Sequence, residues 1–360
     1  MSARPNTAMM LRNSASFACA RRAAVILLGS TDRKAPITIR ADHGDVNRLH
    51  SWRCLVSTIR PGYHRVRSTL MLNILVTSTR EKTGRQVAAQ LAAVAAVDVR
   101  GASSRPDAVD IDGVRPARLD WADAISVEAA LDDVDALYLS RPEIEDAPDR
   151  IAAALAPARR LQHVVLLSEM GAESASRETW IARVEQAVRD HAKSWTILRP
   201  TWFSQVLTDD RFYLGAIRDE RILQLPSAGA PVSFIDARDI AAVAVAALLD
   251  RSHAGHEYPL SGPHALRLNQ ITRMLSRAIG ANVRYVDSSI ERACQAARAW
   301  TEPWYLEELR GVYDRLCAGV YGSVSDVVER VTGQRPRALE SFIDEHARMW
   351  RSAAPSTRPS

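Results

Sequence analysis

From residue 73 onward, short apolar, β-branched runs alternate with stretches in which apolar residues recur every three or four positions. The first pattern is typical of buried strands and the second of amphipathic helices. The expected strands lie at 73–78, 97–103, 114–120, 136–140, 163–169 and 195–200, and the expected helices lie near 83–95, 124–133, 145–159 and 178–191. This alternation predicts an α/β fold built on a doubly wound parallel sheet, whose ligands bind at the carboxyl ends of the strands.

The turn between the first strand and the first helix reads TSTREKTG at residues 77–84. Nucleotide-binding folds of this kind carry glycines there, spaced GxxGxxG or GxGxxG, so that a pyrophosphate can approach the helix N-terminus. In the GxxGxxG spacing, the three glycine positions hold Ser78, Glu81 and Gly84. Glu81 is unfavourable there, because one like-charge contact at about 4 Å costs roughly 1 kcal/mol in water and roughly 4 kcal/mol at an effective dielectric of 20.

Two interpretations of this turn remain open. In the first, the turn still binds a dinucleotide, and the candidate binding residues are Thr77, Ser78, Thr79, Arg80, Lys82, Thr83 and Gly84. In the second, it is a polar loop of a fold that has lost its cofactor. A cavity at the sheet edge with the Glu81 side chain turned outward would favour the first interpretation. A Glu81 side chain that points into the phosphate site would favour the second.

Charge and composition exclude several classes of function. The net charge is +5, but residues 1–70 carry 12 Lys+Arg and 3 Asp, so the rest of the chain carries +5 − 9 = −4. Nucleic-acid binding needs a clustered basic surface, and no such partner is expected. No apolar run approaches the ~20 residues of a membrane span. The four cysteines and nine histidines show no metal-ligand spacing, so we expect no metal site and a cytoplasmic protein with reduced thiols.

Pattern and composition divide the chain into four parts. Residues 1–70 are an Arg-rich segment without Glu, which we interpret as a disordered basic extension or a start assigned upstream of the natural Met71; a targeting segment is the other interpretation. Residues 71–250 hold the predicted nucleotide-binding domain, 251–352 a small α/β lid, and 353–360 a disordered tail. A helix after residue 235 is expected to be capped by Asp236 or Asp239.

Six segments, taken in order, resemble one family. They read ILVTSTREKTGRQVAAQL, RLDWAD, LLSEMGAE, WTILRPTWFSQ, VSFIDARDIAAVAVAALL and YPLSGPHALRLNQITRMLSRAIGANVRYVD. This set is similar to the NmrA-like atypical short-chain dehydrogenases, and most closely to the branch of the ergot-alkaloid (agroclavine or festuclavine) dehydrogenases. The resemblance covers residues 72–350. It implies a Rossmann-type NAD(P)-binding fold and, for many members, NADPH-dependent reduction of a small organic substrate, whereas other members resemble redox sensors.

The second strand and its loop indicate which cofactor to expect. No acidic residue ends this strand, while Arg100 lies within it and Arg105 follows it. Because an arginine accommodates the 2′-phosphate of NADP, we expect NADP rather than NAD. The YxxxK pair of the common short-chain dehydrogenases is absent. Glu169, after the fifth strand, is then the candidate proton donor, and the adjacent Ser168 is a candidate cofactor contact.

The segment LRPTWFSQ, after the sixth strand, predicts where a substrate would bind. Trp202, Phe203 and Gln205 would place two aromatic rings and an amide over the nicotinamide, which suits a flat, largely apolar substrate. The sequence therefore predicts an NADPH-dependent reductase of a small hydrophobic metabolite, present as a monomer or homodimer. Two alternatives stay open: a non-catalytic NADP(H) sensor, and a cofactor-free relative that binds or isomerises a small molecule.

Overall fold

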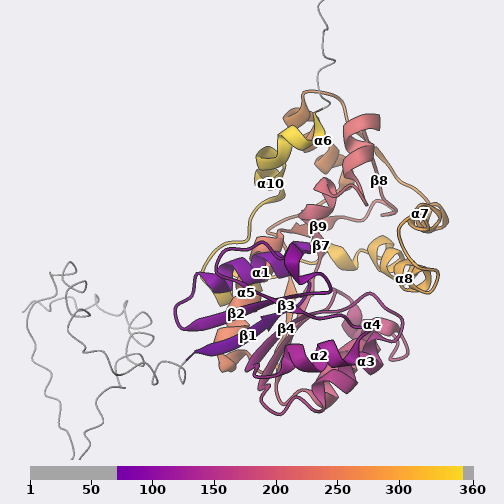
Figure 1. Cartoon of the computed structure of the whole chain (residues 1–360). Coiled ribbons are helices and arrows are strands. Elements are labelled where there is room, and N and C mark those ends of the chain that lie inside the picture. The colour runs from indigo at the N-terminus through magenta and orange to yellow at the C-terminus, as the bar shows by residue number, and fades with distance from the viewer. Residues whose placement is uncertain (1–70, 352–360) are drawn as a thin grey trace, which may run out of the picture. The chain divides into compact units, whose positions relative to one another are not determined.

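The computed structural model describes residues 71–351. Its central sheet has seven parallel strands in the order β10-β6-β5-β4-β1-β2-β3 (Figure 1). The strands are β1 (Leu72–Val76), β2 (Val97–Ser103), β3 (Arg115–Arg118), β4 (Ala136–Ser140), β5 (His163–Leu167), β6 (Trp195–Pro200) and β10 (Glu257–Leu260). The order of the first six is that of a dinucleotide-binding sheet, with its switch point between β1 and β4. The predicted doubly wound α/β fold is confirmed.

Helices cover both faces of this sheet. On one face lie α1 (Lys82–Ala92), α5 (Ala237–Leu249) and α9 (Val327–Thr332), and on the other lie α2 (Ala124–Leu131), α3 (Ala147–Leu155) and α4 (Trp180–His191). Successive residues of a strand point to opposite faces. Accordingly, Ile74 and Val76 belong to the first core and Leu75 to the second. Strands buried on both faces are mostly apolar, which explains the apolar runs in the sequence; the buried His163, Thr196 and Arg199 are exceptions.

A lid with its own core lies above the sheet in Figure 1. Its strands are β7 (Trp202–Phe203), β8 (Ile222–Gln224), β9 (Val232–Ile235), β11 (Ala265–Leu266) and β12 (Arg284–Val286). Its helices are α6 (Leu268–Ile279), α7 (Ile290–Ala297), α8 (Tyr305–Cys317) and α10 (Leu339–His346). Single turns of 3-10 or π-helix occur at Pro106–Ala108, Ala172–Ser174, Ser204–Thr208, Ala216–Glu220, Arg251–His253, Val320–Gly322 and Ala347–Trp350.

The chain passes between the sheet and the lid more than once. β7, β8 and β9 precede residue 250 but contribute to the lid core. β10 follows residue 250 but pairs with β6, and α9 packs against α5. A single boundary at that residue therefore does not describe the packing. The predictions for residues 1–70 and 353–360 concern parts of the chain outside the described residues.

Three further properties concern the described residues only. None of the helices within 71–351 combines the length and the apolar character needed to cross a membrane. Over the same range, no three His, Cys, Asp or Glu side chains come together as a set of metal ligands. Cys294 and Cys317 are free thiols.

Candidate functional site

The backbone of the β1–α1 turn explains which glycine the sequence retains. A Cβ atom on Gly84 would lie 2.3 Å from the carbonyl oxygen of Ser78 and 2.5 Å from that of Thr77. No side chain fits there, because the helix N-terminus packs directly on the turn. Ser78 occupies the first glycine position with φ 53°, in the left-handed region. That conformation strains a serine but does not exclude it, so this position can lose its glycine.

The threonines of the turn join β1 to its neighbours. The buried Thr77 hydroxyl accepts a hydrogen bond from the backbone N–H of Ser140 at the end of β4 (2.8 Å). The Thr79 hydroxyl donates to the carbonyl of Ala102 in β2 (3.0 Å), and Thr83 is buried in the first turn of α1. Thr77 and Thr79 therefore shape the turn, and their hydroxyl groups are already bonded to protein.

Glu81 and Lys82 are held by a segment of the lid. Glu81 precedes α1 but its side chain does not cap the helix; the carboxylate is 56% exposed and lies 3.3 Å from the guanidinium of Arg211. Lys82 pairs with Asp209 and lies over the ring of Phe212 (5.1 Å to the centroid). Burial alone would raise the pKa of Asp209, but hydrogen bonds from Arg211 and Lys82 outweigh it and hold the pKa well below its usual range. Glu81 is thus half-exposed and paired with Arg211, but it also lines the cleft beside this turn.

A cleft of ≈ 360 Å³ opens beside this turn, at the ends of β1, β2 and β3. Its lining includes Ser78, Arg80, Glu81, Asp120, Trp121 and Arg150. The Arg80 side chain is exposed and has no ion-pair partner within residues 71–351, whereas Arg150 bonds to Asp146 (2.8 Å). The cleft thus combines a glycine-type turn, an indole and side chains of both charges at the ends of β1, β2 and β3, next to the switch point between β1 and β4 where dinucleotides bind in this class of fold.

Of the two arginines expected to select NADP, only Arg105 lies near the cleft. It follows β2, is exposed, and its backbone N–H bonds to the hydroxyl of Ser103, a cleft residue (3.1 Å). Arg100 instead donates to the carbonyl of Asp132, past the end of α2 (2.6 Å). The chain there enters β4, so Arg100 points toward the amino edge of the sheet. A mid-strand arginine is long enough to reach either edge, and the sequence does not say which.

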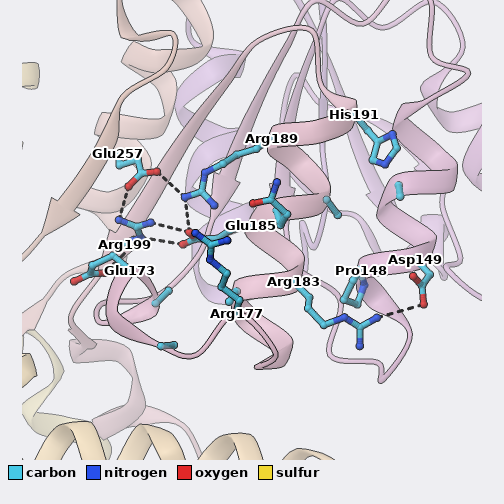
Figure 2. Close-up of a pocket in the computed structure, with 16 residues that line it drawn as sticks. Pro148, Asp149, Glu173, Arg177, Arg183, Glu185, Arg189, His191, Arg199 and Glu257 are labelled. Carbon is cyan, nitrogen blue, oxygen red and sulfur yellow. Dashed lines mark hydrogen bonds and ion pairs between the residues drawn. The ribbon is translucent and has the colours of Figure 1, made fainter.

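Ser168 bonds to a charge network of Glu185, Arg189, Arg199 and Glu257. Figure 2 shows these four residues, which line a second cleft, of ≈ 700 Å³, beside α3 and α4. The Ser168 hydroxyl donates to Glu185 (2.6 Å), which also accepts two bonds from Arg199 (2.9 and 2.7 Å). Arg189 and Glu257 complete the network. Burial alone would raise the pKa of Glu185, but bonds from Arg199 and Ser168 outweigh it and lower the pKa. The Ser168 hydroxyl is therefore directed to α4.

Glu169 lies between two arginines at the carboxyl edge. One oxygen accepts from Arg141, directly after β4 (2.9 Å), and the other pairs with Arg315 of α8. Both carboxylate oxygens are therefore bonded to guanidinium groups. Sequence reasoning missed both partners. Arg141 could have been found, since it directly follows the strand predicted at 136–140, but no pattern indicates which face of α8 meets the sheet.

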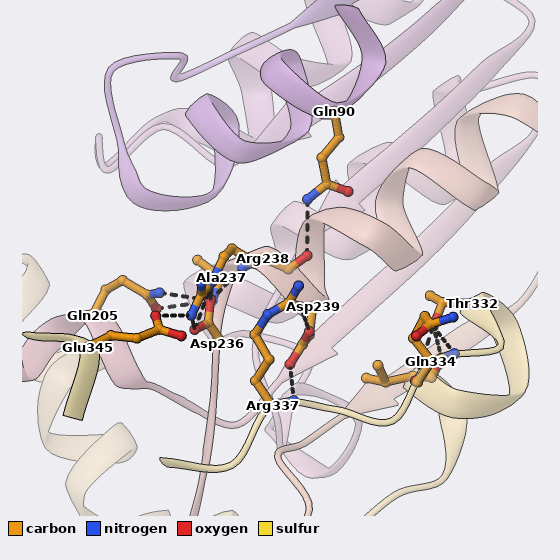
Figure 3. Close-up of polar contacts among 11 residues, drawn as sticks. Gln90, Gln205, Asp236, Ala237, Arg238, Asp239, Thr332, Gln334, Arg337 and Glu345 are labelled. Atoms are coloured by element: carbon orange, nitrogen blue, oxygen red, sulfur yellow. Dashed lines mark hydrogen bonds and ion pairs between the residues drawn. The ribbon is translucent and has the colours of Figure 1, made fainter. Parts of the chain in front are cut away.

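Trp202, Phe203 and Gln205 do not share one pocket. Trp202 and Phe203 are consecutive in β7, so they point to opposite faces. Trp202 packs edge-on against Tyr321 in the lid core (5.4 Å between centroids), and Phe203 packs on the sheet core. The Gln205 amide donates to Asp236 (3.0 Å) and accepts from the first N–H of α5 (3.0 Å), as Figure 3 shows. Gln205 thus supports the N-terminus of α5.

Of the two predicted caps of α5, Asp236 is the one observed. Its carboxylate accepts the backbone N–H of Arg238 (2.8 Å) and bonds to the guanidinium of the same residue. Asp239 instead accepts from the backbone N–H of Arg337 (2.7 Å) (Figure 3). Both carboxylates are therefore structural, one within α5 and one between α5 and the C-terminal segment.

Known proteins are similar to this chain in sequence and in fold. A (4-alkanoyl-5-oxo-2,5-dihydrofuran-3-yl)methyl phosphate reductase from Streptomyces griseus is 34% identical over 281 residues, 76% of this chain and 98% of that protein. An NAD(P)H azoreductase from Xenophilus azovorans is 34% identical over 241 residues, 65% and 83% of the two chains. The structure of Citrobacter sp. triphenylmethane reductase complexed with NADP(H) shares the fold, with a TM-score of 0.63 at 19% identity over 76% of this chain and 99% of that one.

The expected family is confirmed. Agroclavine dehydrogenase from Claviceps fusiformis is 24% identical over 290 residues, 78% of this chain and 99% of that protein. The ergot-alkaloid dehydrogenases are thus relatives, although the two bacterial reductases are more similar in sequence. The NmrA-like family matches residues 75–307. A match of that length, together with a relative covered almost end to end, shows that the chain belongs to the NmrA-like family.

Proposed function

We propose that the protein is an NAD(P)H-dependent reductase of a small organic substrate. The observation that carries the proposal is the β1–α1 turn, which keeps the close approach at Gly84 and the left-handed backbone at Ser78. The names of the two bacterial relatives support it, since one is a reductase of a phosphate ester and the other an NAD(P)H azoreductase.

The residues of the turn fit a dinucleotide. The N-terminus of α1 has no side-chain cap, so its first amides would hold a pyrophosphate. The Glu81 carboxylate lines the cleft, but it is half-exposed and paired with Arg211 (3.3 Å), which would reduce its repulsion of a pyrophosphate. When bound, the nicotinamide supplies a hydride. The chain itself supplies the binding, the orientation and a charged edge beside the reacting carbon.

The cofactor that we propose is NADP. Arg80 and Arg105 lie at the ends of β1 and β2, where a 2′-phosphate would be bound, and no carboxylate ends β2. Asp120 lines the cleft, but it accepts the N–H of Ala122 in its own turn (3.0 Å). We also propose a cytoplasmic location and a monomer or homodimer; the free thiols of Cys294 and Cys317 support the location.

We assign Glu169 a role in organising charge rather than in proton donation. Its two oxygens are bonded to Arg141 and Arg315, so the proton that a reduced substrate needs would come from solvent. The absence of a YxxxK pair agrees with a substrate whose carbon accepts a hydride without strong acid assistance.

Calorimetric titration of NADPH and NADH into the full chain tests the proposal. We expect NADPH to bind, and Arg80→Ala or Arg105→Ala to weaken its binding by about tenfold, the loss of one charged phosphate contact, while NADH binding changes little. Arg100→Ala is the matched control, because its side chain lies at the other edge, and it should change neither affinity. Absence of binding by both nucleotides would contradict the proposal. Binding without turnover across azo compounds, quinones and phosphate esters would favour the sensor.

A further inference from the structure

We propose that the substrate carries a phosphate ester, which Arg141 and Arg315 bind in the place now taken by the Glu169 carboxylate. The inference rests on the proposed function, because it names the substrate class of the same site. It is argued from the geometry of the two guanidinium groups.

The two arginines come from different parts of the molecule and meet at one carboxylate. Arg141 directly follows β4 and Arg315 lies in α8 of the lid. Their side chains are only 15% and 18% exposed, and the Glu169 side chain is 15% exposed. Each arginine binds a different oxygen of Glu169. The carboxylate therefore marks a position where the protein holds an oxyanion between the sheet and the lid.

This position has more hydrogen-bond donors than Glu169 uses. The Nε atoms of Arg141 and Arg315 are buried, and neither has an acceptor within residues 71–351. Buried N–H groups normally find a partner. Three phosphate oxygens accept more bonds than two carboxylate oxygens, and guanidinium groups bind phosphate through pairs of N–H groups.

The surrounding charges set a condition for the binding of a dianion. Burial alone would lower the pKa of Arg141, but the Glu169 carboxylate outweighs it and raises the pKa, so the guanidinium stays charged. Glu143 acts on Arg141 in the same direction, and Glu308, which accepts the N–H of Trp180 (2.9 Å), acts on Arg315. Two cations can balance a phosphate dianion only if Glu169 is displaced. Removal of the Glu169 charge should therefore tighten phosphate binding.

The position lies where a substrate of the proposed reductase would sit. Strands in a sheet are about 4.8 Å apart, so the ends of β4 and β5 lie about 5 and 10 Å along the edge from the β1–α1 turn. The Arg141 guanidinium lies 5.7 Å from the centroid of the Trp180 ring, a buried ring that also packs against Trp304 and Tyr305. A Cβ on Gly171 would lie 2.6 Å from Cδ of Arg315, so this glycine allows the arginine to reach the edge.

Calorimetric titration of phenyl phosphate tests the inference, with phenol as the uncharged counterpart. We expect phenyl phosphate to bind the full chain and Arg315→Met to weaken it about tenfold or more, as for the loss of one charge-assisted pair. Arg310→Met is the matched control, because Arg310 lies on the same helix, is exposed and pairs with Glu291 (3.4 Å). It should leave the affinity within about twofold. Glu169→Gln should tighten phenyl phosphate about tenfold.

Three outcomes would overturn the inference: phenol that binds as tightly as phenyl phosphate, an Arg315→Met protein that binds as the unaltered one does, or a Glu169→Gln protein with unchanged or weaker affinity. Circular dichroism checks that each variant is folded. If Arg315→Met does not fold, the affinity of Glu169→Gln for phenyl phosphate alone tests the inference. NADPH is titrated in parallel. If the unaltered chain does not bind NADPH, the proposed reductase function is contradicted. Binding of phenyl phosphate that depends on Arg315 would still support the anion site in that case.

Discussion

At the scale of single residues, the three glycine positions of the turn have separate physical requirements. Position 84 must be glycine because a Cβ atom would meet the backbone, and position 78 must adopt a left-handed φ. At position 81 only the direction of the side chain matters. Only the first requirement excludes every other residue. This explains why a sequence with one glycine of three can keep the geometry of the turn.

Gly84→Ala should destabilise the protein and weaken NADPH binding. The new methyl group would meet backbone oxygens at 2.3 and 2.5 Å, so α1 must move away from the turn. We expect a loss of about 1–3 kcal/mol in the free energy of unfolding, measured with urea. Gly215→Ala is the control, since no atom lies within 4 Å of its added Cβ and its backbone is helical. An equal loss in both variants would refute the contact argument.

Ser78→Gly should stabilise the turn and tighten NADPH binding. A serine at φ 53° pays a conformational cost that glycine does not, and the gain is about 0.5–1 kcal/mol after glycine's greater freedom in the unfolded chain. Ala96→Gly is the matched control, because Ala96 has φ 62° but lies at the other end of the α1 unit. Both variants should gain stability in urea, and only Ser78→Gly should gain affinity in calorimetry. Equal affinities would show that the serine side chain does not limit the approach.

At the scale of elements, the positions of strands and helices were easier to predict than the hydrogen-bond and ion-pair partners of polar side chains. The strands at 97–103, 136–140 and 195–200 have the predicted bounds, although only the second has an unbroken apolar run, ALYL, and the first contains Asp98 and Arg100. The two-residue strand β7 carries no such pattern, and its alternation separated Trp202 from Phe203. Polar partners such as Arg141 and Arg315 depend on how distant elements meet, which local patterns do not encode.

The network between α4 and β6 should contribute strongly to stability. Glu185 and Arg199 are buried, with side chains 2% and 7% exposed, and they form two hydrogen bonds. Glu185→Gln removes the buried anion and leaves Arg199 partly unbalanced, so we expect a loss of about 3 kcal/mol in urea unfolding at neutral pH. Glu173→Gln removes a half-exposed carboxylate 3.5 Å from the same arginine and should cost about 0.5 kcal/mol or less. Similar losses would contradict the importance of burial.

His163, at the start of β5, should make stability depend on pH. Its Nδ1 lies 2.9 Å from the Ser194 hydroxyl and the residue is fully buried. Burial, together with the charges of Arg251 and His253, lowers its pKa to about 4. The unfolded chain, with an ordinary pKa near 6.5, therefore takes up a proton first as the pH falls. Stability should be complete above pH 6.5 and should fall by up to about 3 kcal/mol as the pH decreases to about 4.

The test compares urea unfolding of the unaltered protein, His163→Gln and His191→Gln between pH 4 and 7. The His163 variant should lose this pH dependence whatever its absolute stability. His191 is exposed at the end of α4, so its replacement should leave the dependence intact. A dependence that survives in His163→Gln would assign it to other groups.

At the scale of the whole molecule, the lid is fastened to the sheet by charged contacts around the proposed site. Glu169 bonds to Arg315, Asp239 to Arg337, and Lys82 to Asp209. The sequence predicted a lid at the carboxyl edge, but not that β10 and α9 return to the sheet between its elements. Such returns depend on long-range packing, because an edge strand of alternating burial such as β10 could join either part.

The contact between Lys82 and Asp209 should oppose cofactor binding while stabilising the free protein. Lys82 is the first residue of α1, beside the proposed pyrophosphate position, and its ammonium group forms an ion pair with the Asp209 carboxylate. Asp209→Asn should release Lys82 to a phosphate and tighten NADPH binding by about threefold to tenfold. It should also lower the melting temperature without nucleotide by a few degrees, since about 1 kcal/mol corresponds to about 2–4 °C in a domain of this size.

Asp210→Asn, an exposed neighbour, should change neither quantity. Calorimetry and thermal unfolding with and without NADPH measure both effects. Weaker NADPH binding in Asp209→Asn would instead mean that the carboxylate holds Lys82 in its binding position.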